Sequence, residues 1–184
     1  MLNALLRKRP KSGASSQKVG EALYNAVSVQ ARQPAFYTDL GVEDRIDARF
    51  ELYTLHVLLL ILRLRDEDKD GPAAGAAYAQ SLFDVYVSAL DNVLRELGVG
   101  DMSMARKMRT LGEALYGRMT AYEPPVRADD AQTLALHLAR NVYISEDTAR
   151  AESLARYALA ARASLANQKF ADVLTAPNWP EIKP

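Results

Sequence analysis

The sequence predicts an all-α protein, a single-domain bundle of about six helices with a central helical hairpin. Apolar residues recur at steps of three and four along most of the chain, which places each set on one stripe of a helix. No stretch alternates apolar and polar residues over a length useful for a strand, and no internal repeat is present. With 184 residues, the chain is long enough for one well-filled core and short for two.

The chain is expected to divide into three parts. Residues 1–16 form a basic, loosely ordered tail, residues 17–175 form the helical domain, and residues 176–184 form an extended C-terminal tail. The first helix is predicted from about residue 16 to residue 32, because Pro34 cannot continue it.

The next two segments are a loop and the second helix. Residues 34–42 are expected to be an ordered loop that buries Phe36–Tyr37, since each ring carries on the order of 150–250 Å² of surface. The second helix begins at residue 43 or 44 and runs to about residue 65. Its second half is apolar almost all round, which indicates a central position in the domain. The charged segment 65–72 follows. It has Ala77 where a calcium loop needs glutamate, so calcium is excluded.

The central hairpin is predicted over residues 73–122. Gly98 directly follows the stripe of its first helix and suits the left-handed residue that closes a helix. Asp101 or Ser103 can accept from the free N–H groups that open its second helix. Pro124–Pro125 is expected to end that helix.

The remaining helices lie in the C-terminal third of the chain. A fifth helix is predicted over about residues 128–142. The sequence Ser145–Thr148 is typical of an N-terminal cap and predicts a sixth helix that runs to about residue 165. One short turn is expected around residues 170–174.

Composition excludes several classes of function. The 23 basic and 23 acidic side chains balance, so net charge argues neither for nor against a nucleic-acid partner. No cysteine is present, which excludes disulfides, thiolate metal sites and cysteine nucleophiles, and fits a reducing compartment. The longest apolar run, Val57–Leu62, is far shorter than the about 20 residues that cross a bilayer. We therefore expect a soluble protein that is not exported.

The N-terminal tail allows two interpretations. Residues 1–20 carry five basic and no acidic side chains. The leucines and basic residues of segment 1–11 could contact an anionic membrane surface or ribosomal RNA. The alternative is a solvated tail with no partner.

No motif indicates an enzyme or a bound cofactor or metal. His56 and His137 are the only histidines, and neither stands in a haem or zinc spacing, so both are expected to be structural. Phosphate-binding loops, dinucleotide fingerprints and nucleophile elbows are absent from the sequence.

The methionines gather in the hairpin. All except Met1 fall within residues 102–119, and the same window is rich in basic residues: Met102, Met104, Met108 and Met119 beside Arg106, Lys107, Arg109 and Arg118. A flexible methionine face with basic neighbours suits an apolar polypeptide partner or a ribosome surface. The alternative, favoured for Met104 and Met108, is that they are core residues; Met102 lies in the joint and is the better candidate for exposure.

Several strings resemble the ubiquinol–cytochrome c chaperone family. They cover about residues 20–165 in the expected order: Ala31–Tyr37, Asp47–Leu52 with His56, Leu82–Asp84, Leu94–Asp101, and Tyr116–Arg118 with Tyr122. The string Leu-Arg-Glu-Leu-Gly-Val-Gly-Asp followed by Tyr-Gly-Arg is the most specific. The resemblance implies an all-helical, non-enzymatic chaperone that assists assembly of the cytochrome bc1 complex (respiratory complex III).

The resemblance also implies partners and a location. In mitochondria the family works with a small partner at the ribosomal exit and receives newly made cytochrome b. The present chain resembles a bacterial member, which implies a cytoplasmic protein with peripheral contact to the inner membrane; a mitochondrial location is the alternative. Newly made cytochrome b or bc1 intermediates are the expected partners, and DNA is not.

The sequence and the resemblance together give a site hypothesis. The client is expected to contact the hairpin through a set of joint and basic residues: Gly98, Val99, Gly100, Asp101, Met102, Arg106, Arg109 and Arg118. Arg49, Arg95 and Glu96 are expected to form buried ion pairs that brace the bundle. The alternatives are a ribosome- or RNA-binding helical module, and a bundle that binds haem or a small molecule through His56 or His137.

Overall fold

The fold is all-α, as predicted. The computed structural model describes residues 14–67 and 74–184, apart from the side chains of residues 14, 74 and 101. Within these ranges the chain forms eight α-helices and one π-helical segment, and no strand. The helices are α1 (Ala14–Ala31), α2 (Pro34–Thr38), α3 (Ile46–Glu67), α4 (Ala74–Glu96), α5 (Asp101–Ala128), α6 (Ala131–Leu138), the π-helix η2 (Ala139–Tyr143), α7 (Ala149–Asn167) and α8 (Phe170–Thr175).

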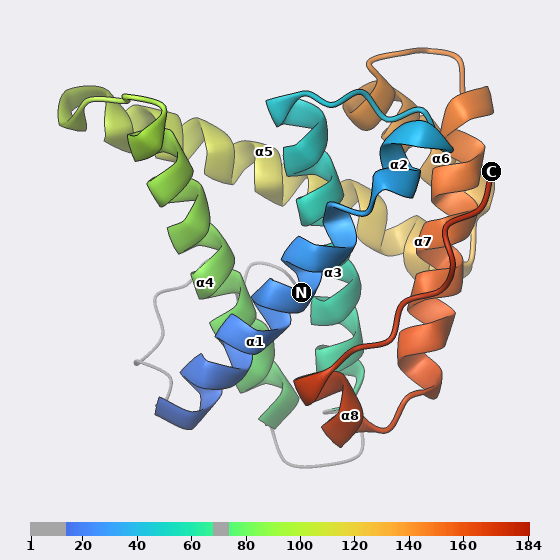
Figure 1. Cartoon of the computed structure of the whole chain (residues 1–184), viewed down its shortest axis with the longest axis horizontal. Helices are drawn as coiled ribbons and strands as arrows, with labels where there is room; N and C mark the ends of the chain where they lie inside the picture. The colour runs from blue at the N-terminus through green and yellow to red at the C-terminus, as the bar shows by residue number, and fades with distance from the viewer. Residues whose placement is uncertain (1–13, 68–73) are drawn as a thin grey trace.

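Helix α3 is the centre of the bundle. It contacts α1, α4, α5, α7 and η2, and the other helices surround it (Figure 1). Its apolar run Val57–Leu62 is buried at every position, which confirms the central position predicted from the lack of a polar face. Burial on all sides explains why this helix needs no amphipathic pattern in its second half.

The expected aromatic loop forms the short helix α2. Pro34 begins it, where the missing N–H is not needed. The ring of Phe36 is fully buried, whereas Tyr37 is half-buried and donates its hydroxyl to the carbonyl of Ala31 at 3.2 Å. The prediction of a buried aromatic pair is therefore correct for Phe36 and partly so for Tyr37.

Helix α5 passes through the two prolines that were expected to end it. Pro124 and Pro125 lie inside the helix, which ends at Asp129 in a left-handed conformation with φ of 56°. The N–H of Asp129 donates to the carbonyl of Pro125 and caps the helix. Pro125 and Val126 are both buried, so packing against the bundle offsets the loss of two N–H donors.

For the joint between α4 and α5, the prediction is correct for the end of α4 and not for the start of α5. Gly98 adopts φ of 78°, and the N–H of Val99 donates to the carbonyl of Leu94 at 3.1 Å, which is the bond of a Schellman motif. The start of α5 differs, because its N-cap is Gly100, which has no side chain to accept from the free N–H groups. The hydroxyl of Ser103 donates to the carbonyl of Gly100 at 3.0 Å instead of accepting from an N–H group.

The two helices of the hairpin diverge from this joint. Helix α4 packs on α1 and α3, whereas α5 packs on α3, α6 and α7. Figure 1 shows the joint at the edge of the molecule, far from α6 and α7. The hairpin therefore presents its joint as a projecting end, and each helix is anchored separately by its other half.

The C-terminal residues 176–184 carry no helix and lie along the bundle. Pro177 is buried, and the ring of Trp179 lies edge-on against His56 with a centroid distance of 5.1 Å. The backbone of Asn178 exchanges two hydrogen bonds with the side-chain amide of Gln168, at 2.7 and 2.8 Å. At the other terminus, most of the expected basic tail lies outside the described residues, and α1 already begins at residue 14.

The charged segment between α3 and α4 is described only at its start. Arg65, Asp66 and Glu67 belong to α3, and the rest of the segment, residues 68–72, lies outside the described residues. None of the described helices combines the length and the apolar character that a membrane span needs.

Candidate functional site

Three apolar side chains are exposed where α4 meets α5. Val93 is 44% exposed, Leu97 56% and Met102 101%, which confirms the expected exposure of Met102. A Cβ added at Gly98 or Gly100 would meet no atom within 4 Å, so the joint is open on these sides. The projecting end of the hairpin is therefore apolar and accessible, which is unusual for a surface with no partner.

The other hairpin methionines lie inside the bundle or at its boundary. Met104 is 5% exposed and Met119 is fully buried, whereas Met108 is half-buried. The prediction that Met104 is a core residue is thus correct, and the same prediction for Met108 is correct in part. Met102 is the fully exposed one of these four methionines.

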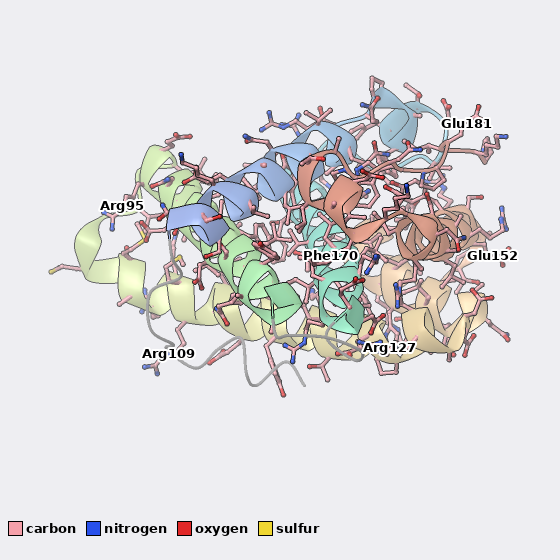
Figure 2. All side chains as sticks on the ribbon, turned by 90° about the horizontal axis from the view of Figure 1, so that it is seen from below. Arg95, Arg109, Arg127, Glu152, Phe170 and Glu181 are labelled. Carbon is pink, nitrogen blue, oxygen red and sulfur yellow. The ribbon has the colours of Figure 1, made fainter. Side chains whose placement is uncertain are left out.

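Three cationic side chains follow the apolar end along α5. Arg106, Lys107 and Arg109 are exposed, and no described residue forms an ion pair with any of them. Spacings of four and seven residues place Arg106 and Arg109 on the same face of the helix as Met102. Figure 2 shows Arg109 pointing away from the ribbon near the projecting end, with Arg95 on the other helix of the hairpin.

Arg118 does not join this exposed group. Its Nε donates to Oε1 of Glu51 at 2.9 Å, and the carboxylate of Glu51 is only 3% exposed. The hydroxyl of Tyr122 donates to the other oxygen of Glu51 at 3.2 Å and accepts from the amide of Asn141 at 3.1 Å. Arg118 thus connects α5 to α3, and its placement argues against contact with a client.

Burial and ion pairing shift the pKa of Glu51 in opposite directions. Burial raises the pKa of the Glu51 carboxyl, and the Arg118 guanidinium beside it lowers that pKa by a smaller amount. The sequence analysis missed this residue. The signal was present, because Glu51 stands between Phe50 and Leu52, one turn before the apolar second half of the helix.

The residues expected to brace the bundle by buried ion pairs do not do so. Arg49 pairs with Asp44 at 2.6 Å, and both side chains are more than half exposed. Arg95 pairs with Asp91 of its own helix at 2.8 Å with its side chain 52% exposed, and Glu96 is exposed. These pairs are local in sequence and solvated, so each contributes little to stability.

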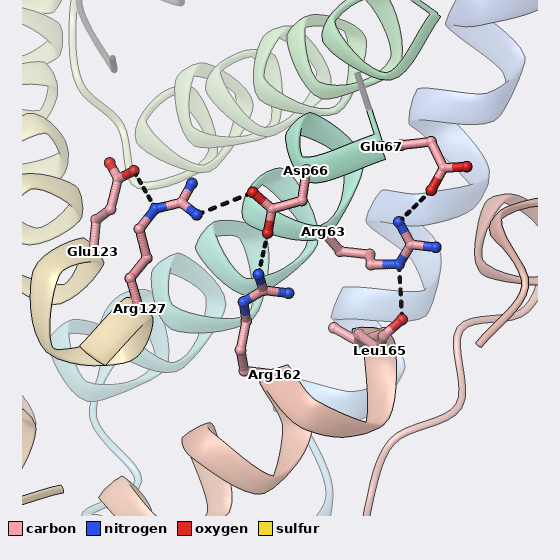
Figure 3. Close-up of polar contacts among 7 residues, drawn as sticks. All are labelled: Arg63, Asp66, Glu67, Glu123, Arg127, Arg162 and Leu165. Atoms are coloured by element: carbon pink, nitrogen blue, oxygen red, sulfur yellow. Dashed lines mark hydrogen bonds and ion pairs between the residues drawn. The ribbon is translucent and has the colours of Figure 1, made fainter. Parts of the chain in front are cut away.

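A cluster of ion pairs that the sequence analysis did not single out joins the ends of α3, α5 and α7 (Figure 3). Asp66 bridges Arg127 of α5, at 3.0 Å, and Arg162 of α7. Arg63 pairs with Glu67 at 2.8 Å and donates its Nε to a carbonyl of α7 at 2.8 Å. Only tertiary structure brings these groups together, so spacing along the chain could not reveal them.

His56 has a structural role. It is fully buried; its Nδ1 bonds the carbonyl of Leu52 at 2.7 Å, and its Nε2 bonds the hydroxyl of Tyr157 at 2.9 Å. Burial lowers the pKa of His56 to about 4, so the ring is neutral at physiological pH. The carbonyl can only accept, so Nδ1 carries the proton and Nε2 accepts from Tyr157. Both ring nitrogens are occupied, which leaves none for haem iron.

His137 and the carboxylates do not form a metal site either. His137 is half-buried, and its ring centroid lies 6.3 Å from that of Tyr122. Among residues 14–67 and 74–184, no three acidic or histidine side chains converge as metal ligands would. The hairpin end presents exposed apolar side chains beside exposed positive charge.

Comparison with known proteins gives two matches and one negative result. The sequence model described as ubiquinol-cytochrome C chaperone matches residues 38–179. Among solved structures, the chain is similar to one titled as the Cbp3 homolog from Brucella abortus, with 30% sequence identity and a TM-score of 0.80. The similarity covers 92% of this chain and 93% of that one. No curated protein matches the sequence.

Proposed function

The chain belongs to the ubiquinol-cytochrome C chaperone family, and from this we propose that it is a non-enzymatic assembly chaperone of the cytochrome bc1 complex that binds newly made cytochrome b. The observation that carries the proposal is the family match over residues 38–179, supported by the shared fold over 92% of the chain. The place of action that fits this client is the cytoplasmic face of the inner membrane.

The hairpin end supports a binding role for this client. Cytochrome b is a bundle of apolar helices, so a chaperone for it needs exposed apolar surface that adapts to different side chains. Leu97 and Met102 provide such surface, and methionine is the most adaptable apolar side chain. The proposed contact set is Val93, Leu97, Gly98, Val99, Gly100, Met102, Arg106 and Arg109; the side chain of Asp101 lies outside the described residues.

The rival functions find less support in the structure. A haem-binding bundle was expected to use His56 or His137. Both ring nitrogens of His56 have protein partners, which leaves His137, half-buried beside the ring of Tyr122, as the remaining candidate. A ribosome- or RNA-binding module rested on the basic N-terminal segment, and residues 1–13 lie outside the described part of the chain. Neither is proposed as the main function.

Deletion of the gene in its own host tests the proposal. We expect haem spectra of the membranes to show lowered cytochrome b and bc1 complex, while the other respiratory complexes persist. A plasmid copy of the native gene should restore the spectrum. Normal cytochrome b and bc1 levels in a clean deletion would contradict the proposal.

A further inference from the structure

We propose that the projecting end of the α4–α5 hairpin also docks on an anionic lipid bilayer. Val93, Leu97 and Met102 enter the membrane interface, and Arg106, Lys107 and Arg109 contact the headgroup phosphates. The proposal deepens the proposed function and rests on it at one point, that the client is a membrane protein.

The depth of the charged groups matches a bilayer interface. Helix α5 rises about 1.5 Å per residue, so Arg106 lies about 6 Å and Arg109 about 10 Å behind Met102 along the helix axis. Helices that bind at a membrane interface bury their apolar face about 5–10 Å into the boundary between headgroups and acyl chains. With Met102 at that depth, the two guanidinium groups reach the level of the phosphates.

The shape of the surface favours a soft partner. The joint projects at the edge of the molecule, its glycines face open space, and Met102 is 101% exposed. Among residues 14–67 and 74–184, no segment covers this convex apolar end. A lipid interface deforms around such an end, whereas a rigid protein partner would need a matching concave pocket.

The charge of the surface identifies the class of lipid. Arg106, Lys107 and Arg109 are exposed without ion pairs among the described residues, while the exposed carboxylates described nearby are Glu96 before the joint and Glu113 one turn beyond Arg109. The anionic lipids of a cytoplasmic leaflet attract these three cations.

Vesicle binding by the purified full-length chain tests the proposal. Vesicles of phosphatidylcholine mixed with phosphatidylglycerol are sedimented with the protein, beside vesicles of phosphatidylcholine alone. We expect binding to the mixed vesicles that weakens as salt is added. The double variant Arg106→Gln, Arg109→Gln should bind about 25-fold more weakly, because each basic residue near an anionic surface contributes about fivefold.

Apolar variants test entry into the interface. The double variant Leu97→Ser, Met102→Ser should also bind more weakly, and its exposed sites leave folding unchanged by circular dichroism. Matched controls lie elsewhere on the surface: Val29→Ser, at a side chain 66% exposed, and the double variant Arg150→Gln, Lys169→Gln. Both controls should bind like the native chain.

Three outcomes would overturn the proposal. They are no binding to mixed vesicles, equal binding by the native chain and both hairpin variants, and loss of binding in the arginine variant alone. The second outcome would assign binding to another segment, such as residues 1–11, and the third would indicate contact without entry. The assay contains no cytochrome b, so a lack of vesicle binding would not contradict the proposed chaperone function. Equally, normal bc1 levels in the deletion strain would not contradict vesicle binding.

Discussion

Glu51 illustrates how a single charged residue is retained in the apolar core of this bundle. It lies on α3, accepts hydrogen bonds from Arg118 and Tyr122, and is almost fully shielded from solvent. A buried carboxylate without such partners would be strongly destabilising. The same contacts join α3 to α5, so the hydrogen bonds that stabilise the buried carboxylate also hold these two helices together.

Replacing Arg118 tests that coupling. Arg118→Ala should lower the free energy of unfolding by about 2 kcal/mol, below the loss for a fully buried pair, because the arginine is partly exposed. Arg49→Ala is the matched control, since its pair with Asp44 is solvated and should contribute less than about 1 kcal/mol. Urea unfolding measures both variants. Equal losses would show that the buried carboxylate of Glu51 does not depend on Arg118.

His56 makes stability depend on pH. The folded chain keeps the ring neutral down to its lowered pKa of about 4, whereas the unfolded chain protonates it near pH 6.5. Stability is therefore lost as pH falls through this window, by up to about 3 kcal/mol from this group. The variant His56→Gln should lack this part of the acid sensitivity. Urea midpoints measured between pH 7 and about pH 4 should diverge for the two proteins, and parallel curves would contradict the assignment.

At the scale of the elements, helical periodicity predicted the main helices and the central position of α3. It failed where packing overrides local preference. Pro124 and Pro125 remain helical because Pro125 and Val126 are buried against the bundle, and no property of the proline pair itself indicates this. The ion pairs of Arg118, Asp66 and Arg162 join helices far apart in sequence, so spacing could not reveal them.

The candidate site was predictable in part. The exposure of Met102 followed from its place in the joint, and the left-handed Gly98 from its place after the last apolar residue of the stripe. Arg118 was grouped with the exposed cations because it is near them along the chain. The sequence does not show which face of α5 packs against α3, so it could not place Arg118 on that face. Its buried partner decides its role.

The turn between α4 and α5 gives a matched pair of glycine substitutions. Gly98→Ala should destabilise the protein by about 1 kcal/mol, because φ of 78° strains a residue that has a Cβ. Gly100→Ala should have little effect, since neither added Cβ meets a neighbour and Gly100 has an ordinary φ of −69°. Thermal unfolding compares the two. A larger loss at Gly100 would mean that the turn is not closed as described.

At the scale of the molecule, the structure separates a stable body from an accessible end. The body is built on α3 and braced at one end of that helix by the ion pairs of Arg63, Asp66 and Arg162. The α4–α5 joint lies at the edge of this body and exposes apolar and cationic side chains. A partner can therefore bind the projecting end without unfolding the bundle, which suits a chaperone that must later release its client.

Site-specific photocrosslinking in the host tests most directly that the hairpin end contacts newly made cytochrome b. A photoreactive amino acid is placed at position 102 or 109, and a control is placed at position 29, which is exposed on α1. Illumination during cytochrome b synthesis should yield a crosslink to cytochrome b from positions 102 and 109 and none from position 29. Crosslinks from position 29 together with none from the hairpin would contradict the account.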